Sequence, residues 1–479
     1  MASKDRVTFV CNHCGHVYGQ WQGNCAKGCK SWDTIVEFKE EKLKSKEKAR
    51  AGGYSTIEGD EVKRMSEVDS SEIVRISSGL GEFDRVAGRS DIKDDKGRVI
   101  RTDYGICVGS VILLSAEPGG GKTTLLSQVI GKLSFEMICM YSTGEESLDQ
   151  YRGRMEDRLK VDYNDDNLFL MSEFSVENII KKAIEKNVKF LVVDSIQSLE
   201  GDYTGSAGGV SQVKGCAQEL CRYAKSRGVI LCLLGHVNKN NSELAGPKVL
   251  AHIVDSVFHI DVSDSSLRVL RSSKNRFGDV DSVGIFQMNE RGMISVDNPS
   301  KIFLSGAASD VSGSSITCIR DGNRNLLLET QALVTECDAE HPQRVCIGLN
   351  HNRLKMISAV LRKHGGIKLH HDIYINLVGG LKLPETDTSA DLSLCAAIVS
   401  SLQDIPLSRQ YCFIGETSLS GEVRPISQGV PRVSEAIKHG FTKIYIPKAN
   451  YHKSMESKGV EILPIEHVRD LIVAIQKQP

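Results

Sequence analysis

The sequence predicts an α/β protein with a small cysteine-rich module at its start and two larger domains after it. Three observations predict this organisation. From about Ile73, short apolar runs typical of buried strands alternate with helical patterns, as in helices packed on a mostly parallel sheet. Four cysteines in two close pairs precede this region, and the alternation restarts after about Pro299. With 479 residues, the chain is too long for a single hydrophobic core.

The composition limits the classes of function. A formal net charge of -1 gives no general attraction to nucleic acid or to anionic membranes, so any nucleic-acid site is local. No apolar run approaches the ~20 residues that span a bilayer. Residues 1–6 lack an apolar signal core, so we expect a cytoplasmic protein without membrane contact. The cysteines outside the N-terminal cluster lie in apolar segments, and we expect them to be buried free thiols.

The strongest motif is a glycine-rich turn at residues 115–124, between the strand-like run Val111–Leu114 and a helical pattern. This order of elements is what a phosphate-binding loop requires, because glycines let N–H groups surround an anion at a helix N-terminus. We expect Lys122 to reach the β- and γ-phosphates of ATP and Thr123 to ligate Mg²⁺. Ala116 replaces the usual first glycine, a position that tolerates a small residue. The predicted nucleotide-binding residues are Glu117, Pro118, Gly119, Gly120, Gly121, Lys122, Thr123 and Thr124.

The N-terminal cysteines have the spacing of a zinc site. Thiolates in two close pairs can converge tetrahedrally on Zn²⁺, and so small a module needs the metal to fold. A disulfide pair or a cluster of free thiols is the alternative, and a cytoplasmic setting counts against it. Trp21 and Trp32 are the only tryptophans, and we expect them to cover the metal core rather than to stack on a base. The predicted ligands are Cys11, Cys14, Cys25 and Cys29, with His13 and His16 as substitutes.

Acidic residues follow two strand-like runs. Residues 190–194 are four apolar residues and Asp194, the form expected of the carboxylate that faces the Mg²⁺ shell. Glu145 and Glu146 follow the strand-like run Glu136–Tyr141. A carboxylate there can polarise the water that attacks the γ-phosphate. The alternative is a pair of glutamates at a helix N-terminus, where the helix dipole favours negative charge, and for Glu146 this is the better interpretation.

Later segments carry weaker signals. The strand-like run Val229–Leu234 ends at His236, a candidate sensor of the γ-phosphate. Two glycine-rich loops, 201–209 and 238–248, contain small residues, and the second contains Lys239 and Lys248; they suit a DNA backbone as well as an ordinary surface loop. Lys274 and Arg276 flank an amide after the strand-like run 267–272. Such cations can stabilise the γ-phosphate of a neighbouring subunit, whereas alone they would indicate a basic β-turn.

Taken together, the motifs resemble one family over nearly the full length of the chain. They resemble the RadA (Sms) family of bacterial DNA-repair proteins, which implies a RecA-type ATPase core. The resemblance implies homo-hexameric rings on single-stranded DNA that use ATP to drive branch migration of recombination intermediates. It implies that Glu145 is the hydrolytic glutamate, that Lys274 and Arg276 act at a site shared between subunits, and that a recombinase or replicative helicase is a partner. The segments that carry it are the cysteine module with Trp21-x-Gly23 and residues 31–34, the phosphate-binding loop, and residues 144–147, 193–197, 235–239, 245–250, 254–255 and 274–278.

The C-terminal part resembles the proteolytic domain of Lon, an α+β domain. Residues 387–391 align with its nucleophile segment and place Ser389 at the serine position. The following glycines place Val430 where the lysine base belongs. Without a base, Ser389 is an ordinary serine at a helix start, and we expect a scaffold that is not a peptidase.

These observations predict four regions and leave two rival functions open. We expect a zinc finger at 1–35, a charged linker at 36–72, a RecA-like ATPase domain at 73–299 and a Lon-like domain at 300–479. Residues 91–103 are an insertion expected to form a charged hairpin. The rivals to a DNA motor are a nucleotide-gated scaffold that recruits a helicase or recombinase, and an ATP-dependent peptidase, which Val430 disfavours.

Overall fold

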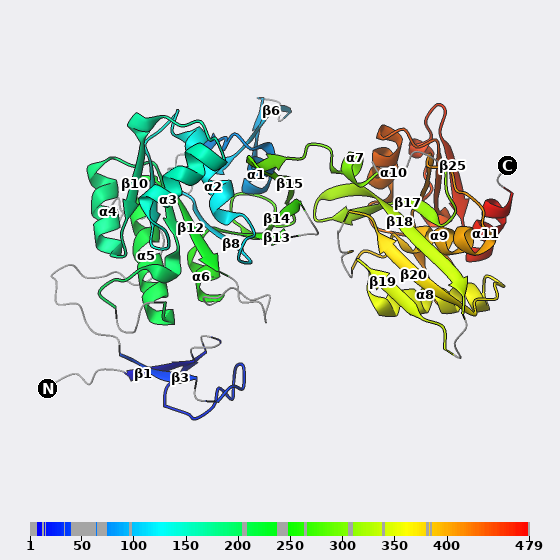
Figure 1. Ribbon diagram of the computed structural model, residues 1–479, viewed down its shortest axis with the longest axis horizontal. Helices are drawn as coiled ribbons and strands as arrows, with labels where there is room; N and C mark the ends of the chain where they lie inside the picture. The colour runs from blue at the N-terminus through cyan, green and yellow to red at the C-terminus, as the bar shows by residue number, and fades with distance from the viewer. Residues whose placement is uncertain are drawn as a thin grey trace. The chain divides into compact units, whose positions relative to one another are not determined.

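The computed structural model shows two compact units. It describes residues 7–11, 14, 16–32, 34–39, 64, 74–94, 98–203, 208–236, 248–262, 266–304, 310–337, 341–379, 383 and 386–477. Unit 1 comprises Met1–Val262 and Ser266–Val296, and unit 2 comprises Ser263–Ser265 and Asp297–Pro479 (Figure 1). Most of the predicted linker 36–72 lies outside the described residues.

A three-stranded antiparallel sheet forms the N-terminal ribbon. Its strands are β1 (Val7–Cys11), β2 (Val17–Tyr18) and β3 (Ile35–Lys39), in the order β2-β1-β3. Among its described side chains, Cys11, Tyr18, Cys25 and Ile35 are buried, with Phe9, Cys14 and Cys29 packed against them. The cysteines are thus part of the core, as expected of a module that needs a metal.

The main sheet of unit 1 has nine strands in the order β10-β9-β11-β12-β8-β13-β14-β15-β16. The six strands from β10 to β13 are parallel, and β14, β15 and β16 continue the sheet in antiparallel fashion. Their bounds are β8 (Val111–Ala116), β9 (Cys139–Thr143), β10 (Leu168–Ser172), β11 (Phe190–Asp194), β12 (Ile230–His236), β13 (Ser256–Val262), β14 (Leu267–Asn275), β15 (Val283–Asn289) and β16 (Gly292–Ser295).

Helices cover both faces of this sheet (Figure 1). Side chains of β8 alternate between the two cores, since Ile112 and Leu114 pack on one face and Val111 and Leu113 on the other. Helices α1 and α2 and the Tyr151 side chain of α3 pack on the first face, and α4, α5 and α6 pack on the second. The helices are α1 (Gly81–Ala87), α2 (Lys122–Leu133), α3 (Leu148–Gly153), α4 (Val176–Glu185), α5 (Val210–Arg227) and α6 (Lys248–Ile253).

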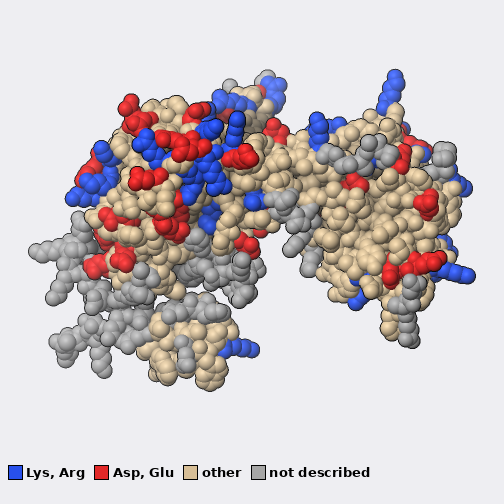
Figure 2. Space-filling view, in the orientation of Figure 1, with Lys and Arg blue, Asp and Glu red and all other residues tan. Residues whose placement is uncertain are grey.

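Local predictions in unit 1 are confirmed with small shifts. The strand predicted from Glu136 begins at Cys139. The insertion is a hairpin, since β5 (Arg89–Lys93) pairs with β6 (Val99–Tyr104). A two-stranded sheet of β4 (Arg75–Ile76) and β7 (Ile106–Cys107) lies near it in sequence. Basic and acidic side chains are interspersed on the visible surface, in keeping with the near-zero net charge (Figure 2).

Unit 2 is built on a seven-stranded mixed sheet in the order β19-β20-β18-β17-β21-β24-β25. Helix α9 is buried along most of its length between this sheet and neighbouring helices, because its sequence from Leu392 to Ser400 has no charged residue. The strands are β17 (Ser314–Asp321), β18 (Arg324–Glu336), β19 (Arg344–Ile347), β20 (His371–Leu377), β21 (Tyr411–Phe413), β24 (Lys443–Pro447) and β25 (Glu461–Ile465), with a small hairpin of β22 (Glu416–Thr417) and β23 (Val423–Arg424). The helices are α7 (Pro299–Phe303), α8 (His351–Lys363), α9 (Asp391–Gln403), α10 (Gly429–Lys438) and α11 (Val468–Gln476). Among the described residues of the chain, none of the helices is long and apolar enough to cross a membrane.

Candidate ATPase site and zinc centre

The phosphate-binding loop connects β8 to α2 as predicted. A Cβ atom at Gly120 would lie 2.7 Å from Cβ of Ala116, so the loop can close over the Ala116 methyl group only because residue 120 is glycine. This contact explains how the loop accommodates alanine at its first position. Gly121 has a φ of 98° and begins α2 in the left-handed conformation that glycine adopts without strain. The N-terminus of α2 therefore faces the loop, where its dipole favours an anion.

Lys122 is buried at the start of α2. Its Nζ atom donates a hydrogen bond to the Ala116 carbonyl at 3.3 Å. Burial lowers the pKa of Lys122, and attraction by Asp194 and Glu145 opposes that shift. A cation held between the loop and two carboxylates is well placed for the phosphates of a nucleotide.

Asp194 lies at the carboxyl end of β11 with only 4% of its surface exposed. Its Oδ2 atom accepts a hydrogen bond from Thr123 Oγ1 at 3.1 Å and another from the Tyr141 hydroxyl. Burial raises the pKa of Asp194, and the hydrogen bonds from Tyr141 and Thr123 act against this. The structure thus joins the predicted magnesium residues Thr123 and Asp194, which a hydroxyl and carboxylate ligand set for Mg²⁺ requires.

The two glutamates after β9 have different surroundings. Glu145 is exposed, and its N–H donates to Thr143 Oγ1 at 3.2 Å. Glu146 is bound by the Arg154 guanidinium through two hydrogen bonds, of which Nη1–Oε1 is 2.6 Å. Helix α3 starts at Leu148 after the cap Ser147, so Glu146 lies directly before a helix N-terminus and has a side-chain partner in addition.

The parallel strands bring the candidate residues to one edge of the sheet. The phosphate-binding loop, Glu145 and Asp194 follow the carboxyl ends of β8, β9 and β11, where α/β sheets place ligands. His236 ends β12 at the level of Ala116. Its side chain, the loop 238–247 with Lys239, the side chain of Lys248 and part of the loop 201–209 lie outside the described residues.

Arg276 lies near the opposite end of β8, and Lys274 lies level with its middle. Lys274 pairs through Val257 with Leu113, and the Arg276 N–H bonds to the carbonyl of Asp255, which is level with Val111. At roughly 3.3 Å per residue, the strand rises about 17 Å from Val111 to Ala116 and about 10 Å from Leu113 to Ala116. These cations are therefore remote from the phosphate-binding loop of their own chain.

Both cations have partners inside unit 1. Lys274 Nζ donates to the carbonyls of Ala251 and Val254, at 2.6 and 2.7 Å, at the end of α6. Burial and the nearby Arg276 lower the pKa of Lys274. Arg276 Nη1 lies 3.2 Å from Oδ1 of the buried Asp255, an oxygen that also accepts from Lys225 at 2.8 Å.

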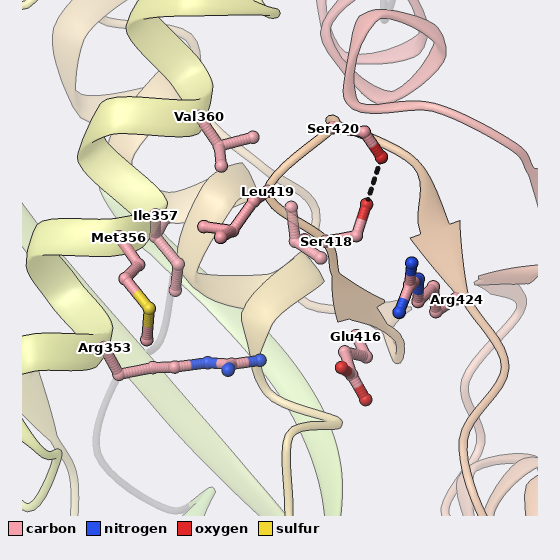
Figure 3. A pocket seen from close by; sticks show the side chains of 10 residues that line it. Arg353, Met356, Ile357, Val360, Glu416, Ser418, Leu419, Ser420 and Arg424 are labelled. Atoms are coloured by element: carbon pink, nitrogen blue, oxygen red, sulfur yellow. Dashed lines mark hydrogen bonds between the residues drawn. The ribbon is translucent and has the colours of Figure 1, made fainter.

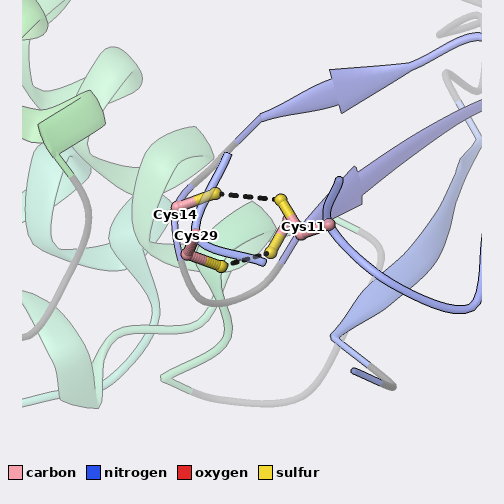
Figure 4. Close-up of side chains that lie close together, drawn as sticks. Cys11, Cys14 and Cys29 are labelled. Carbon is pink, nitrogen blue, oxygen red and sulfur yellow. Dashed lines mark hydrogen bonds between the residues drawn. The ribbon is translucent and has the colours of Figure 1, made fainter. Parts of the chain in front are cut away.

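The four predicted cysteines converge in the N-terminal ribbon (Figure 4). Their sulfur atoms all lie within 4.8 Å of one another, and the Cys11–Cys29 and Cys14–Cys25 distances are 3.7 and 3.3 Å. Zn–S bonds of about 2.3 Å place tetrahedral ligands about 3.8 Å apart, so the cluster fits Zn²⁺. No disulfide joins any of the 14 cysteines, which excludes that alternative here. The other cysteines are buried free thiols as predicted, except the half-buried Cys337 and Cys346.

The prediction that the tryptophans cover the metal core is wrong. Trp21 is 60% exposed and Trp32 is 71% exposed. Tyr18 takes the covering position, and its hydroxyl donates to Cys25 Sγ at 3.1 Å. A Cβ atom at Gly28 would lie 2.6 Å from Cys14 Sγ, so glycine is needed beside the ligands.

In unit 2, Ser389 is not an ordinary serine at a helix start. Helix α9 begins at Asp391 with Ala390 as its cap, and Ser389 is fully buried. Its hydroxyl accepts a hydrogen bond from Arg432 Nη1 at 2.7 Å, and this arginine also bonds to Asp387 Oδ2 at 3.0 Å. Val430, at the expected lysine position, is 42% exposed. An arginine stays protonated, so it cannot take the proton of Ser389.

A cavity of 360 Å³ also lies in unit 2, between α8 and the β22–β23 hairpin (Figure 3). Arg353 at its wall is held by two hydrogen bonds to Asp391. Ser389 is not among the residues lining this cavity, so a molecule in it does not meet that hydroxyl. The lining residues are Arg353, Met356, Ile357, Val360, Glu416, Thr417, Ser418, Leu419, Ser420 and Arg424.

Comparison with known proteins identifies the family. The chain is 42% identical over 477 residues to the DNA repair protein RadA of Escherichia coli, an alignment that covers 98% of this chain and 99% of that protein. This chain belongs to the RadA family of DNA repair proteins. It is also 38% identical to the Bacillus subtilis RadA over 474 residues, covering 98% of each chain.

Matches to parts of the chain agree with this RadA-family assignment. The family described as "AAA domain" matches residues 103–242, "Rubredoxin metal binding domain" matches 9–37, and "Subunit ChlI of Mg-chelatase" matches 346–450. Among solved structures, a KaiC-like protein from Pyrococcus horikoshii has 21% identity and a TM-score of 0.37, covering 47% of this chain and 99% of its own. The ATPase domain of a second solved protein has 14% identity and a TM-score of 0.39, covering 48% of this chain and 94% of its own.

The predicted fold class and cofactors are confirmed. The RadA-family chain has a RecA-like P-loop ATPase core, which uses ATP and Mg²⁺, an N-terminal zinc-binding cysteine cluster, and mixed α/β sheets. Sequence reasoning missed Tyr141, Arg154 and Arg432, each of which contacts a residue that it had singled out, and it named Asp255 without assigning it a role. Tyr141 could have been found only from the pairing of β9 with β11. Asp194 pairs with Thr143, and Tyr141, two residues earlier on β9, lies on the same face of the sheet as Thr143.

Proposed function

We propose that this RadA-family protein is an ATPase dependent on single-stranded DNA. It acts as a homo-hexameric ring that promotes branch migration of recombination intermediates, and a recombinase or replicative helicase is its partner. The observation that carries the proposal is the placement of the two cations along β8 away from their own phosphate-binding loop, about 17 Å for Arg276 and about 10 Å for Lys274. Cations so placed suit the nucleotide of a neighbouring subunit, as in ring ATPases that share sites.

Each site then combines residues of two subunits. Lys122 binds the β- and γ-phosphates, Thr123 and Asp194 hold Mg²⁺, and Glu145 orients the attacking water. Bound Mg²⁺ supplies charge neutralisation at the phosphates. The neighbouring Lys274 and Arg276 stabilise charge that develops on the γ-phosphate.

The contacts of Lys274 suggest how DNA is coupled to hydrolysis. Its ammonium group bonds to carbonyls at the end of α6, the helix that begins where the loop 238–248 ends, and this loop suits a DNA backbone. A neighbour's γ-phosphate and the end of α6 therefore compete for the same three N–H donors. We propose that this competition links the nucleotide state to the DNA-binding segment.

The first test measures ATP hydrolysis with and without single-stranded DNA across a salt series. Stimulation that falls steeply with salt is expected, because phosphate contacts release counterions. Hydrolysis indifferent to DNA would favour the scaffold that recruits a helicase or recombinase. Lys274→Ala is expected to retain ATP binding and lose branch migration, and normal branch migration would remove its proposed role.

A mixing experiment tests the shared site directly. Lys122→Ala and Arg276→Ala proteins are each expected to be inactive. Mixed rings are expected to regain activity, because an Arg276→Ala subunit with an intact loop then receives Arg276 from its Lys122→Ala neighbour. Absence of any recovery, with mixed rings shown to form, would count against action across subunits.

Unit 2 does not support the peptidase alternative. The buried Ser389 is bonded to an arginine that cannot act as a base, and it lies away from the cavity. Casein that remains intact in the presence of ATP is the expected result.

A further inference from the structure

Both tryptophans of the chain, Trp21 and Trp32, are exposed on the zinc ribbon, and we call their two exposed indoles the Trp21/Trp32 surface. Figure 4 shows the neighbouring cysteine centre of the same ribbon. The buried core of the ribbon is made by Cys11, Tyr18, Cys25 and Ile35, so the fold does not use either indole as a core residue. A rigid indole with most of its surface exposed offers an aromatic face on which another flat group can stack.

Both indoles are held in place. Trp21 Nε1 donates to the Ile35 carbonyl at 3.2 Å. One face of the Trp32 ring lies against Gly23, where a Cβ atom would be 3.6 Å from the ring, and its backbone bridges to Asn24. The opposite face of Trp32 remains open, consistent with its 71% exposure. Rings fixed in this way lose little conformational entropy when another flat group stacks on them.

The charges around this surface permit a polyanion to approach. From residue 7 to 39 the ribbon contains Lys27, Lys30 and Lys39 against Asp33 and Glu37, and Lys27 and Lys30 are exposed. Four thiolates with Zn²⁺ carry a formal charge of about −2, which the lysines offset only in part. Affinity at this surface must therefore come mainly from stacking, with little net attraction of phosphates.

The size of the ribbon argues against a protein partner as the primary occupant. Among the ribbon side chains whose exposure the structure describes, Val36 is the one further exposed large apolar side chain. A stable protein interface needs about 800 Å² per partner around such anchors, whereas a stacked base needs only one ring face.

We propose that the Trp21/Trp32 surface stacks on unpaired bases of single-stranded DNA and forms a contact separate from the DNA-binding segments of the ATPase core. This inference rests on the proposed function, which supplies the single strand. Stacking is tolerant of sequence, because every base has an aromatic face.

Intrinsic fluorescence tests this directly, since Trp21 and Trp32 are the only tryptophans of the full chain. The zinc-loaded protein is titrated with oligo(dT) in the presence of a non-hydrolysable ATP analogue, while anisotropy of a labelled oligo(dT) reports total binding. Quenching of tryptophan emission with the same midpoint as the anisotropy change is expected. Blunt duplex DNA, whose bases are paired, is expected to quench much less.

Substitutions give the second readout. Trp21→Leu and Trp32→Leu, each confirmed to retain zinc, are expected to weaken oligo(dT) binding by about fivefold to 150-fold. Phe135→Leu is the matched control, because Phe135 is an aromatic residue of the ATPase core with a similar exposure of 55%; no change is expected.

The outcomes separate this inference from the proposed function. If oligo(dT) binds by anisotropy but tryptophan emission and the affinity of the leucine variants do not change, the stacking surface is refuted and the DNA-dependent ATPase stands. Emission that responds only to an added recombinase or helicase also refutes stacking and assigns the surface to a protein. If oligo(dT) does not bind at all, both proposals fail.

Discussion

Replacing Arg432 by methionine should destabilise unit 2 strongly. The guanidinium group is almost fully buried and donates to Asp387 Oδ2 at 3.0 Å, to Ser389 Oγ at 2.7 Å and to the Cys318 carbonyl at 2.9 Å. Methionine fills a similar volume but leaves the Asp387 carboxylate buried without its cation. Breaking a buried pair in this way costs about 3–5 kcal/mol.

Hydrogen exchange of peptides from α9 and α10, measured in the full chain, reports this loss. Where exchange proceeds through unfolding of the unit, 3–5 kcal/mol corresponds to an increase in exchange rate of about 150-fold to 4000-fold. Lys438→Met on α10, whose side chain is 76% exposed, is the control and should change stability by less than about 0.5 kcal/mol.

The effect should also depend on pH with a defined sign. Burial alone would raise the pKa of Asp387, but Arg432 and hydrogen bonds lower it below its usual value. The pair therefore stabilises the fold above the unfolded carboxyl pKa of about 3.9, and this contribution is lost as the pH falls through the lower folded pKa. In Arg432→Met the carboxyl resists ionisation, so the difference from the unsubstituted protein should shrink as the pH approaches about 4.

A second substitution completes the test. Asp387→Asn in the Arg432→Met background removes the unpaired charge and should restore part of the lost protection. Protection reduced by less than tenfold in the single variant, or no recovery in the double variant, would refute the assignment of Arg432 as the counter-ion of a buried carboxylate.

Three further predictions concern the ATPase site and the ribbon. Lys122→Ala should reduce ATP hydrolysis by at least about 100-fold, with exposed Lys132→Ala on the same helix as the control; retained turnover would contradict the loop assignment. Tyr141→Phe removes one hydrogen bond to Asp194 and should raise the Mg²⁺ concentration needed for half-maximal hydrolysis by about tenfold. Tyr151→Phe, which loses only a contact with Ser127, should leave that requirement unchanged, and equal shifts in both variants would mean a merely structural role. Native mass spectrometry should find about one Zn²⁺ per chain, and chelation should expose residues 7–39 to protease; a metal-free ribbon that resists protease would oppose the four-thiolate site.

The parts of the site that the sequence predicted are those in which short segments determine the geometry. A glycine-rich turn after a strand fixes the positions of Lys122 and Thr123. Asp194 is the last residue of an apolar strand, so its position at the sheet edge is also determined by a short segment. Arg432 and Tyr141 could not be found in this way, because their contacts depend on which helices and strands become neighbours. Ser389 and Arg432 are 43 positions apart in the sequence. The resemblance drew attention to Val430, whereas the residue of α10 that contacts Ser389 is Arg432, two positions later.

The tryptophans illustrate a different limit. From the sequence, an aromatic side chain is expected to cover the small metal core. An aromatic side chain does so, but it is Tyr18, whose hydroxyl bonds to Cys25, and not a tryptophan. Choosing among the aromatic residues of the ribbon requires its pairing register, and no local pattern encodes that choice.

Asp255 has two cationic partners, so Arg276 can leave without removing the last one. The Oδ1 atom of Asp255 accepts from both Lys225 and Arg276, and its Oδ2 atom accepts from the Val111 N–H. If Arg276 turns toward a neighbouring subunit, Lys225 still neutralises the buried carboxylate. The departure of a side chain that is already 47% exposed then costs about 1 kcal/mol or less, instead of the 3–5 kcal/mol of an orphaned buried charge. In such a ring, the Arg276 side chain of each protomer could leave Asp255 for the neighbouring site and return at each turnover without local unfolding.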